Sequence, residues 1–326
     1  MADSKRRIAV VGHFTYFENH FPEGWRDDPD VICLDVSERD YNWLVAIHNF
    51  RPQLTLFYRP ELYPRWLVER VPGLRVALLS EPLPTLKDGE LEYTDETRLR
   101  LQVYGSMSWD AYHWRIFYDA GKKSSAIKLG FPIDEYRPLP IDTSHFRITC
   151  PYSERQLDVV FVGKPTPHRI ARLDFLRSSK LTFLWIAHGM SGGELAALFN
   201  RAKLVLNVHA DGHPAFEPRL YLAAACGAAV LTEALSSQPE LFIESIWELD
   251  DVWHEAALIR IIERAMTTQY PKQFQKDLAS LSTRLLVADL LSHQRLSNAQ
   301  EPIDGSSLDR NAANAAITLD HFKQPG

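Results

Sequence analysis

The segment EPRLYLAAACGAAVLTE, residues 217–233, places a short helix, a glycine and a strand in direct succession. Its alanine-rich part predicts a helix over 219–226, and its apolar end predicts a strand over 228–232. Gly227 separates the two and marks the end of the helix. Small side chains along this helix allow it to pack closely against a sheet. Helices that alternate with strands in this way build parallel sheets.

Arg219 stands at the start of this helix, where a cation is unfavourable. The amino end of a helix carries partial positive charge, so negative or small capping residues are preferred there. A bound anion would resolve the conflict, because backbone N–H groups, the helix dipole and a two-pronged guanidinium would all hold it. We therefore expect Arg219 to face a diphosphate. The alternative is an ion pair of Arg219 with Glu217 or Asp211.

The polar loop before this helix, within LNVHADGHPAFEPRLYLAAACG (206–227), follows a buried strand. The polar residues of this loop are Asn207, His209, Asp211 and His213. The two histidines, with the aspartate between them, suggest a metal site. Prolines and a glycine interrupt the segment, however, so the imidazoles need not share a face, and no third ligand has the spacing of a zinc site. We expect no metal here.

Other strand ends of the second half carry candidate phosphate contacts, because ligands of parallel sheets bind beyond the carboxyl ends of the strands. In FVGKPTPHR, Gly163 permits a close backbone approach. Positive charge comes from the bases that follow it, Lys164, His168 and Arg169. In IAHGMSGGE, His188 follows another predicted strand. An ordinary turn with solvated bases, or helix capping alone, would also explain these residues.

Short apolar runs alternate with helical stretches along the chain, which predicts an α/β protein. The expected strands cover 7–12, 30–36, 53–58, 75–80 and 125–130 in the first half, and 157–163, 181–187, 202–210, 227–233 and 245–250 in the second. The segment 130–154 holds four prolines, which disfavours regular structure. Two long helical patterns follow the second series, over about 252–268 and 271–296.

The first half offers fewer chemical candidates. Gly12 and His13 follow the first predicted strand, and Glu81 follows another, where a carboxylate can act as an acid or a base. The alternative for Glu81 is a surface carboxylate before a proline turn. The chain contains no G-x-S-x-G elbow, no G-x-x-x-x-G-K-[ST] loop and no G-x-G-x-x-G fingerprint. Serine hydrolases, P-loop NTPases and standard dinucleotide oxidoreductases therefore lose their main support.

Composition limits the class of protein further. A length of 326 residues suits two domains better than one. The formal net charge of -6, without a basic block, argues against a general nucleic-acid binder. The three cysteines have no C-x-x-C spacing and predict neither a disulfide framework nor a zinc site. Without a signal peptide or an apolar run of about 18 to 20 residues, we expect a soluble cytoplasmic protein.

The second half resembles GT-B glycosyltransferases, in particular the CgeB-like (spore maturation protein-like) group of the GT4-related retaining enzymes. The resemblance rests on DVVFVGKPTPHR, RAKLVLNVHADG and EPRLYLAAACGAAVLTE. The last of these is similar to the family's run R-x-F-E-A-x-A-C-G-x-x-L-L-T-D. The phrase LGFPIDEYRP is similar to the segment with which the family enters its second domain.

The resemblance implies the GT-B fold, in which two Rossmann-like parallel-sheet domains face each other across a cleft and a C-terminal helix crosses back to the first domain. In this chain it implies an acceptor domain over 1–130, a linker over 131–155 and a donor-binding domain over 156–270. The crossing helix would cover 271–297, and a weakly ordered tail would cover 298–326.

The implied function is transfer of a sugar from a nucleotide diphosphate sugar to an acceptor, with retention of the anomeric configuration and without a cofactor. The family needs no bound metal, because the helix dipole and basic side chains neutralise the leaving diphosphate. The resemblance implies catalytic roles for Arg219 and Lys164, and their positions at strand ends add His13 and Glu81 as catalytic candidates. At the donor, the resemblance implies Gly163, Arg169, Asn207 and His209. Their positions in the sequence add Gly12, His188, Glu217, Pro218, Leu220 and Glu233.

One position departs from the family pattern. Leu222 stands where the family has a glutamate that binds the ribose diol, and a leucine accepts no hydrogen bond. Ribose recognition must therefore differ, or use Glu217 or Glu233. Two alternatives stay open, a GT-B-shaped sugar-nucleotide epimerase and a non-catalytic nucleotide-sugar-binding protein. The acceptor also stays open (a glycan, a lipid-linked glycan, a protein, a metabolite or modified DNA), as does the oligomeric state.

Overall fold

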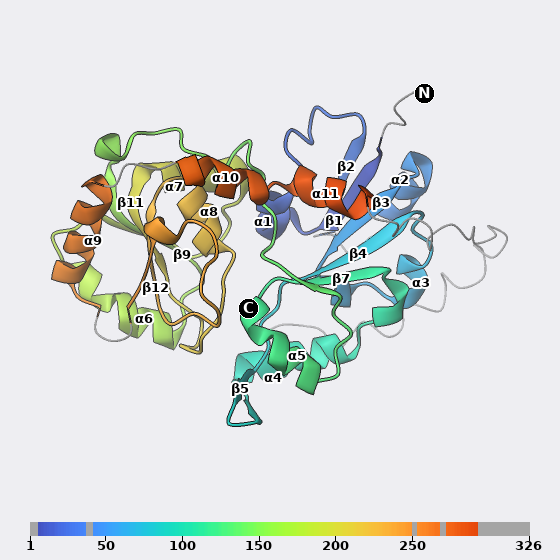
Figure 1. Ribbon diagram of the computed structural model, residues 1–326, viewed down its shortest axis with the longest axis horizontal. Coiled ribbons are helices and arrows are strands. Elements are labelled where there is room, and N and C mark those ends of the chain that lie inside the picture. The colour runs from blue at the N-terminus through green and yellow to red at the C-terminus, as the bar shows by residue number, and fades with distance from the viewer. Residues whose placement is uncertain (1–5, 37–41, 250–252, 268–271, 293–326) are drawn as a thin grey trace.

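The computed structural model of the chain describes residues 6–36, 42–249, 253–267 and 272–292, without the side chain of residue 272. These residues form two α/β units that lie side by side, each built around one parallel sheet (Figure 1). The predicted fold class, two Rossmann-like parallel-sheet domains, is confirmed.

The first sheet has six parallel strands in the order β2-β1-β3-β4-β7-β8. Its central strands β1 and β3 are buried along their full length, as expected where both faces of a parallel sheet are covered. Continuous apolar runs such as IAVVG and LTLFY therefore form strands without alternating polar residues. The strands are β1 (Ile8–Gly12), β2 (Val31–Asp35), β3 (Leu54–Tyr58), β4 (Leu74–Leu79), β7 (Trp114–Phe117) and β8 (Glu135–Tyr136).

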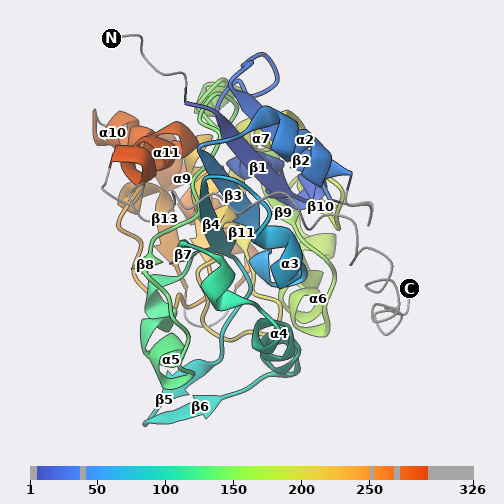
Figure 2. The same ribbon diagram turned by 90° about the vertical axis from the view of Figure 1, so that its right-hand side faces the viewer.

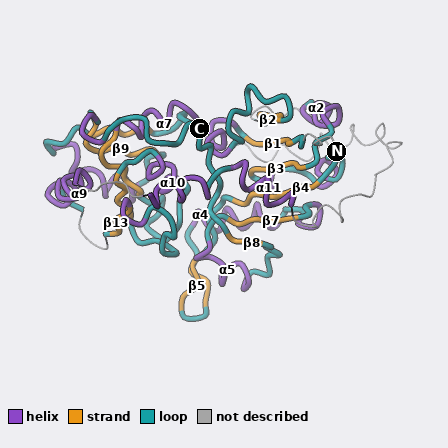
Figure 3. The backbone as a smooth tube through the Cα atoms, turned by 45° about the horizontal axis from the view of Figure 1, so that its top comes forward, coloured by secondary structure: helices purple, strands orange, loops and turns teal. Residues whose placement is uncertain are grey.

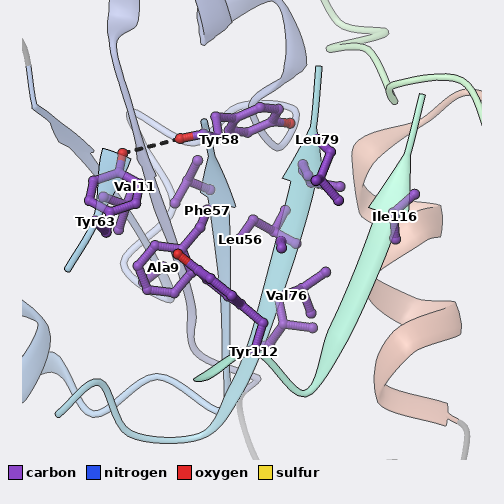
Figure 4. Close-up of a cluster of buried hydrophobic side chains, with 14 of the residues drawn as sticks. Ala9, Val11, Leu56, Phe57, Tyr58, Tyr63, Val76, Leu79, Tyr112 and Ile116 are labelled. Carbon is purple, nitrogen blue, oxygen red and sulfur yellow. Dashed lines mark hydrogen bonds between the residues drawn. The ribbon is translucent and has the colours of Figure 1, made fainter. Parts of the chain in front are cut away.

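The core of this first unit combines aliphatic and aromatic side chains (Figure 4). Leu56, Val76 and Ile116 come from the neighbouring strands β3, β4 and β7 and lie together on one face of the sheet. The hydroxyl of Tyr63 donates a hydrogen bond of 3.1 Å to the carbonyl oxygen of Tyr58. The buried hydroxyl of Tyr63 thus finds an acceptor close by, and this hydrogen bond holds the carboxyl end of β3 in place.

The second sheet has five parallel strands in the order β10-β9-β11-β12-β13. Helix α8 packs against β12 through Ala223, Ala224 and Ala225, which are fully buried. The close packing expected from small side chains is therefore present. The strands are β9 (Leu157–Val162), β10 (Phe183–Ile186), β11 (Ala202–Asn207), β12 (Ala229–Thr232) and β13 (Ile246–Glu248).

Helices cover both sheets. In the view of Figure 2, α2 and α3 lie on one side of the first sheet and α11 lies on the other. The helices of the first unit are α1 (Phe14–Phe17), α2 (Trp43–Phe50), α3 (Arg65–Val68), α4 (Asp95–Gly105) and α5 (Lys123–Lys128). Those that follow are α6 (Pro167–Leu173), α7 (Gly192–Arg201), α8 (Arg219–Ala225), α9 (Glu255–Thr267), α10 (Lys272–Ser280) and α11 (Thr283–Ser292). A hairpin of β5 (Thr85–Lys87) and β6 (Glu90–Glu92) projects away from the body of the molecule (Figure 3).

The last two helices connect the units. Helix α10 packs into the core of the second unit through Phe274, and α11 packs into the core of the first unit through Leu286 and Leu290. The expected return of the chain to the first domain is confirmed. The expectation of one helix over 271–297 is wrong for the described residues, because the helix breaks at 281–282.

A carboxylate of the first unit explains this break. Glu23 Oε1 accepts hydrogen bonds from Ser282 Oγ (2.6 Å) and from the backbone N–H of Thr283 (3.2 Å). Its Oε2 accepts from the backbone N–H of Arg284 (3.1 Å). Glu23 therefore caps the amino end of α11 with a negative charge, which favours the start of a new helix at this point.

Two other expectations are corrected. The segment 125–130, expected to be a strand, begins inside helix α5, and the sheet instead contains β7, where no strand was expected. In β7, Ile116 and Phe117 are fully buried between the strands on either side, so tertiary burial overrides the polar neighbours. The predicted tail over 298–326 lies outside the described residues.

Candidate functional site

A cavity of about 230 Å³ lies between the two units, at the carboxyl ends of both sheets. Loops that follow β4 and β7 line it from the first unit, and the loop that follows β11 lines it from the second. This is the position at which open parallel sheets bind ligands. Its lining residues are Ser80, Pro82, Leu83, Pro84, Thr85, Glu92, Thr94, Glu96, Thr97, Tyr118, Lys122, Arg169, His209, Ala210, Asp211, His213, Pro214, Ala215, Glu217 and Pro218.

Arg219, the first residue of α8, contacts groups of the protein itself. Its Nη2 donates to Glu217 Oε2 at 2.7 Å, and its Nη1 donates to Asn207 Oδ1 at 3.1 Å. The guanidinium also lies over the ring of Phe161, 5.0 Å from its centroid. The ion pair with Glu217, one of the two alternatives from the sequence, is what the structure contains. Glu217 therefore competes with a phosphate for this guanidinium.

Glu217 is surrounded by three cationic side chains. Besides Arg219, Arg169 Nη2 lies 3.5 Å and His209 Nδ1 lies 3.3 Å from Glu217 Oε1. Burial acts to raise the pKa of Glu217, but Arg219, His209 and Arg169 together outweigh it and hold that pKa at about 2. The carboxylate is therefore charged and occupies an anion site.

The imidazole of His209 is buried between two acceptors. Its Nδ1 faces Glu217 Oε1, and its Nε2 lies 2.9 Å from the carbonyl oxygen of Ala234. Both ring nitrogens can donate only if the ring carries two protons. Burial acts to lower the pKa of His209, but the hydrogen bond and the charge of Glu217 outweigh it and raise the pKa. Both contacts therefore favour the doubly protonated form of His209.

Glu233, which follows β12, holds a second set of donors. Its Oε1 lies 2.8 Å from His168 Nε2 and 2.9 Å from Arg172 Nε, and its Oε2 accepts from the backbone N–H of His209 at 2.8 Å. The two carboxylates with their partners form one network at the edge of the second sheet. We call it the charged cluster: His168, Arg169, Arg172, His209, Glu217, Arg219 and Glu233.

The charged cluster has an excess of positive charge. Three guanidinium groups face two carboxylates, so three positive charges minus two negative charges leave one before His168 and His209 are counted, and protonation of His209 raises this excess to two. Such an excess attracts a doubly charged anion, and partial burial strengthens the attraction.

Gly163, in the turn after β9, leaves room for the side chain of Arg169 from helix α6. A Cβ at Gly163 would lie 3.3 Å from Arg169 Nη1, so the absent side chain lets the guanidinium lie against the backbone. Arg169 is 7% exposed and donates to the carbonyl oxygens of Val208 (3.0 Å) and Lys164 (3.1 Å). The side chain of Lys164 itself is exposed and does not line the cavity.

The other predicted donor residues of the second unit differ in position: Pro218 lines the cavity, and the others lie apart from it. His188 is exposed in the turn after β10 and does not line the cavity. The side chains of Leu220 and Leu222 are buried in the core of the second unit, so neither faces a ligand in this conformation. Pro218 lines the cavity and is the N-cap of α8. Asn207, buried at the end of β11, contributes by holding Arg219.

The predicted residues of the first unit do not line the cavity. Gly12 is buried, and a Cβ there would lie 3.1 Å from the Cβ of Tyr58. His13 is the N-cap of α1, and its buried Nδ1 has no hydrogen-bond partner among the described residues. The carboxylate of Glu81 pairs with Arg59 (2.9 Å) and Arg100 (2.7 Å). Burial raises the pKa of Glu81, against the effect of both arginines.

Sequence reasoning missed the first-unit residues that do line the cavity. Tyr118 and Lys122 follow β7, a strand that was itself missed, so no strand end pointed to them. Arg172, which holds Glu233, was missed because it lies one helical turn beyond His168 and Arg169. The helical spacing of these bases, three to four residues apart, was the available signal.

The described residues contain no group of three or more His, Cys, Asp or Glu side chains arranged to hold a metal ion. None of the helices in that part of the chain is both long and apolar enough to cross a membrane.

Residues 145–289 match the family model described as glycosyl transferase-like. This segment contains the whole second sheet and the whole charged cluster. No curated protein matches the chain in sequence.

Solved structures share the path of the chain at low sequence identity. TarM is 9% identical with a TM-score of 0.45, and the alignment covers 76% of this chain but only 56% of TarM. Os79 from O. sativa is 13% identical with a TM-score of 0.41, covering 86% of this chain and 92% of Os79. The UDP-GlcNAc 2-epimerase from Neisseria meningitidis is 10% identical with a TM-score of 0.39, covering 88% of this chain and 99% of the epimerase. At this level the similarity concerns the chain path alone.

Proposed function

We propose that this protein transfers a sugar from a nucleotide diphosphate sugar to an acceptor. The observation that carries the proposal is the excess positive charge of the charged cluster, which lies in the segment similar to glycosyl transferases. Three of its members, Arg169, His209 and Glu217, line the cavity between the units, and Arg219 adjoins them through its ion pair with Glu217. A diphosphate leaving group supplies the negative charge that this cluster lacks.

In the proposed complex, the diphosphate takes the place of the Glu217 carboxylate. Arg219 and Arg169 then donate to phosphate oxygens, and His209 contributes a third positive charge. These groups stabilise the charge that develops on the departing nucleoside diphosphate, because they are positioned before the reaction and partly excluded from water. Glu217, once displaced, is available as a hydrogen-bond acceptor for donor hydroxyls. This would replace the family glutamate whose position Leu222 occupies.

The remaining features of the proposal come from the resemblance to CgeB-like enzymes. The acceptor enters from the side of the first unit, the anomeric configuration is retained, and the reaction needs no bound metal. Lys164 and Glu81 lie outside the cavity in this conformation, so they act in the proposed reaction only after a rearrangement. His13 also lies outside the cavity, so the same condition applies to it.

The test is a melting-temperature screen with UDP-, GDP-, ADP- and dTDP-linked sugars on the wild type, Arg219→Ala and a control, Arg177→Ala. Arg177 is an exposed arginine of the same unit, paired with Asp174 at 3.5 Å. A donor at about 100 times its Kd adds roughly 2.7 kcal/mol to the stability. We expect one nucleotide class to shift the wild type and the control but not Arg219→Ala. A shift that persists in Arg219→Ala removes the charged cluster from the donor site.

Turnover separates the proposed transferase from the two alternatives. A transferase releases nucleoside diphosphate in proportion to glycosylated acceptor. An epimerase converts or hydrolyses the nucleotide sugar without any acceptor. A binding protein shows the melting-temperature shift and releases no nucleoside diphosphate.

A further inference from the structure

Lys122 is a buried lysine on the first-unit wall of the cavity. The residue is 4% exposed, and its Nζ donates to Thr85 Oγ1 at 2.7 Å. Among the described residues, no carboxylate oxygen lies within 4.0 Å of this nitrogen. A buried ammonium group with only a hydroxyl as its partner is unfavourable, because it has lost water without gaining a counter-charge.

The nearest carboxylates leave this charge largely uncompensated. Asp119 accepts hydrogen bonds from Ser236 Oγ (2.7 Å) and from the backbone N–H groups of Phe216 (3.2 Å) and Gly121 (2.9 Å). Asp211 is exposed on the opposite wall of the cavity. Burial lowers the pKa of Lys122, and Asp119 and Asp211 only partly oppose this effect. The ammonium thus lacks a partner that a ligand could provide.

The hydrogen bonds of Asp119 bring Lys122 close to the second unit. Asp119 begins the turn that carries Lys122, and its bond to Phe216 fixes that turn beside the residue that precedes Glu217. Lys122 therefore faces the cavity from one wall while Arg169 faces it from the other. An anion between them would be held by both units at once.

We propose that Lys122 binds a phosphate group of a substrate in this cavity, so that the first unit as well as the second takes part in substrate binding. This inference rests on the proposed function and extends it to the first unit. A phosphate supplies the negative charge that the buried ammonium lacks, in a charge-assisted hydrogen bond. Two sources share this chemistry: the diphosphate of the donor and a phosphate carried by the acceptor.

The first experiment measures binding of UDP, GDP and ADP by titration calorimetry to the wild type, Lys122→Met and Lys123→Met. Lys123 is the matched control, because it is the next residue in the chain and is exposed. If the donor diphosphate is the source, Lys122→Met weakens the tightest nucleotide by about tenfold or more, as expected for a hydrogen bond to a charged group. Lys123→Met leaves the Kd unchanged.

A second arm identifies an acceptor phosphate. Inorganic phosphate is titrated into the protein saturated with the tightest of the three nucleotides. If Lys122→Met abolishes this binding and leaves nucleotide binding intact, the acceptor is the source. If neither nucleotide nor phosphate binding changes in Lys122→Met, while Arg219→Ala loses the nucleotide, the Lys122 proposal is overturned and the proposed function stands. Failure of the wild type to bind any of these probes overturns both.

The melting temperature without ligand excludes a merely structural role for Lys122. Because Met removes a poorly compensated buried charge, we expect Lys122→Met to melt no lower than the wild type. Lys122→Arg keeps the charge and should recover part of the binding. A lower melting temperature with unchanged binding would show that Lys122 serves only to anchor Thr85, and would overturn the proposal.

Discussion

The backbone at Gly121 approaches the carbonyl group of Ser236 so closely that an added Cβ would lie 2.2 Å from that oxygen. Gly121 belongs to the first unit and Ser236 to the second, so the two units meet here without an intervening side chain. The same turn carries Asp119, whose carboxylate accepts from Ser236 Oγ at 2.7 Å. Lys122, the next residue in the chain, lines the cavity, so we expect this contact to set the position of that part of the first-unit wall.

Gly121→Ala should separate the units at this point. The Cβ meets backbone atoms, which cannot move aside as a flexible side chain can, so the joint must open. We expect about tenfold weaker binding of the tightest of UDP, GDP and ADP, because a misplacement of about 1 Å is enough to lose contacts made from both walls. Gly105→Ala is the control, since no atom lies within 4 Å of its added Cβ. Equal Kd values for the wild type and Gly121→Ala would show that the joint does not set the geometry of the site.

Glu217→Gln should have opposite effects on stability and on anion binding. The substitution removes the charge that competes with a phosphate for Arg219, Arg169 and His209. The protein without ligand should melt at a lower temperature, because these cations lose their counter-charge. Binding of the tightest nucleoside diphosphate should become stronger, by about tenfold if one competing charged contact is removed. Weaker binding would indicate that a contact between the Glu217 carboxylate and the nucleotide outweighs the competition of Glu217 for the three cationic side chains.

Stability should depend on pH through the His209–Glu217 pair, with a defined sign. The pKa of His209 is raised above its usual 6.5, so its contribution is complete below about pH 6.5 and is lost as the pH rises through the folded-state value. The pKa of Glu217 is lowered to about 2, so its contribution is complete above about 4.5 and is lost as the pH falls toward 2. The pair therefore stabilises the protein most between about pH 4.5 and 6.5.

Chemical unfolding of the wild type and His209→Gln checks this window. The difference in the free energy of unfolding between the two should be larger at about pH 5.5 than at about pH 9. In a Glu217→Gln background, this difference should vary less with pH, because the partner that raises the pKa is gone. A difference that grows toward alkaline pH would mean that His209 is neutral in the folded protein.

The part of the fold that could be predicted is the part encoded by local periodicity. IAVVG is apolar throughout and LDVVFV is apolar except for Asp158. Both are too short for buried helices, so they indicate central parallel strands. Strand β7 could not be recognised in the same way, because Arg115 interrupts its short apolar run and only the neighbouring strands bury Ile116 and Phe117. The break between α10 and α11 is a tertiary effect as well, since it depends on Glu23 from the far end of the chain.

The residues of the candidate site likewise fall into those that a local sequence pattern brings together and those that only tertiary packing brings together. Arg219, His209 and Glu217 belong to one segment of the sequence, so their proximity followed from the strand–loop–helix pattern. Lys122 reaches the same cavity only through the packing of the two units, which no local pattern encodes. The role of Glu217 was also hidden, because a sequence does not show whether a carboxylate beside an arginine binds it or leaves it to a ligand.

Substitution of Glu81 tests whether a carboxylate at a strand end has a catalytic or a structural role. Its two oxygens contact Arg59 and Arg100, its side chain is 14% exposed, and it does not line the cavity. Glu81→Gln should lower the free energy of unfolding by about 1.5 kcal/mol, because it removes the carboxylate that Arg59 and Arg100 share and leaves Glu61 and Glu96 as their remaining charged partners. Nucleotide binding should stay within about twofold of the wild type, since an indirect effect of this size is below 0.5 kcal/mol. Glu69→Gln is the control, because Glu69 pairs with Arg65 at the surface. Unchanged stability with intact binding but lost turnover would instead assign Glu81 the acid or base role, and would require the units to rearrange during the reaction.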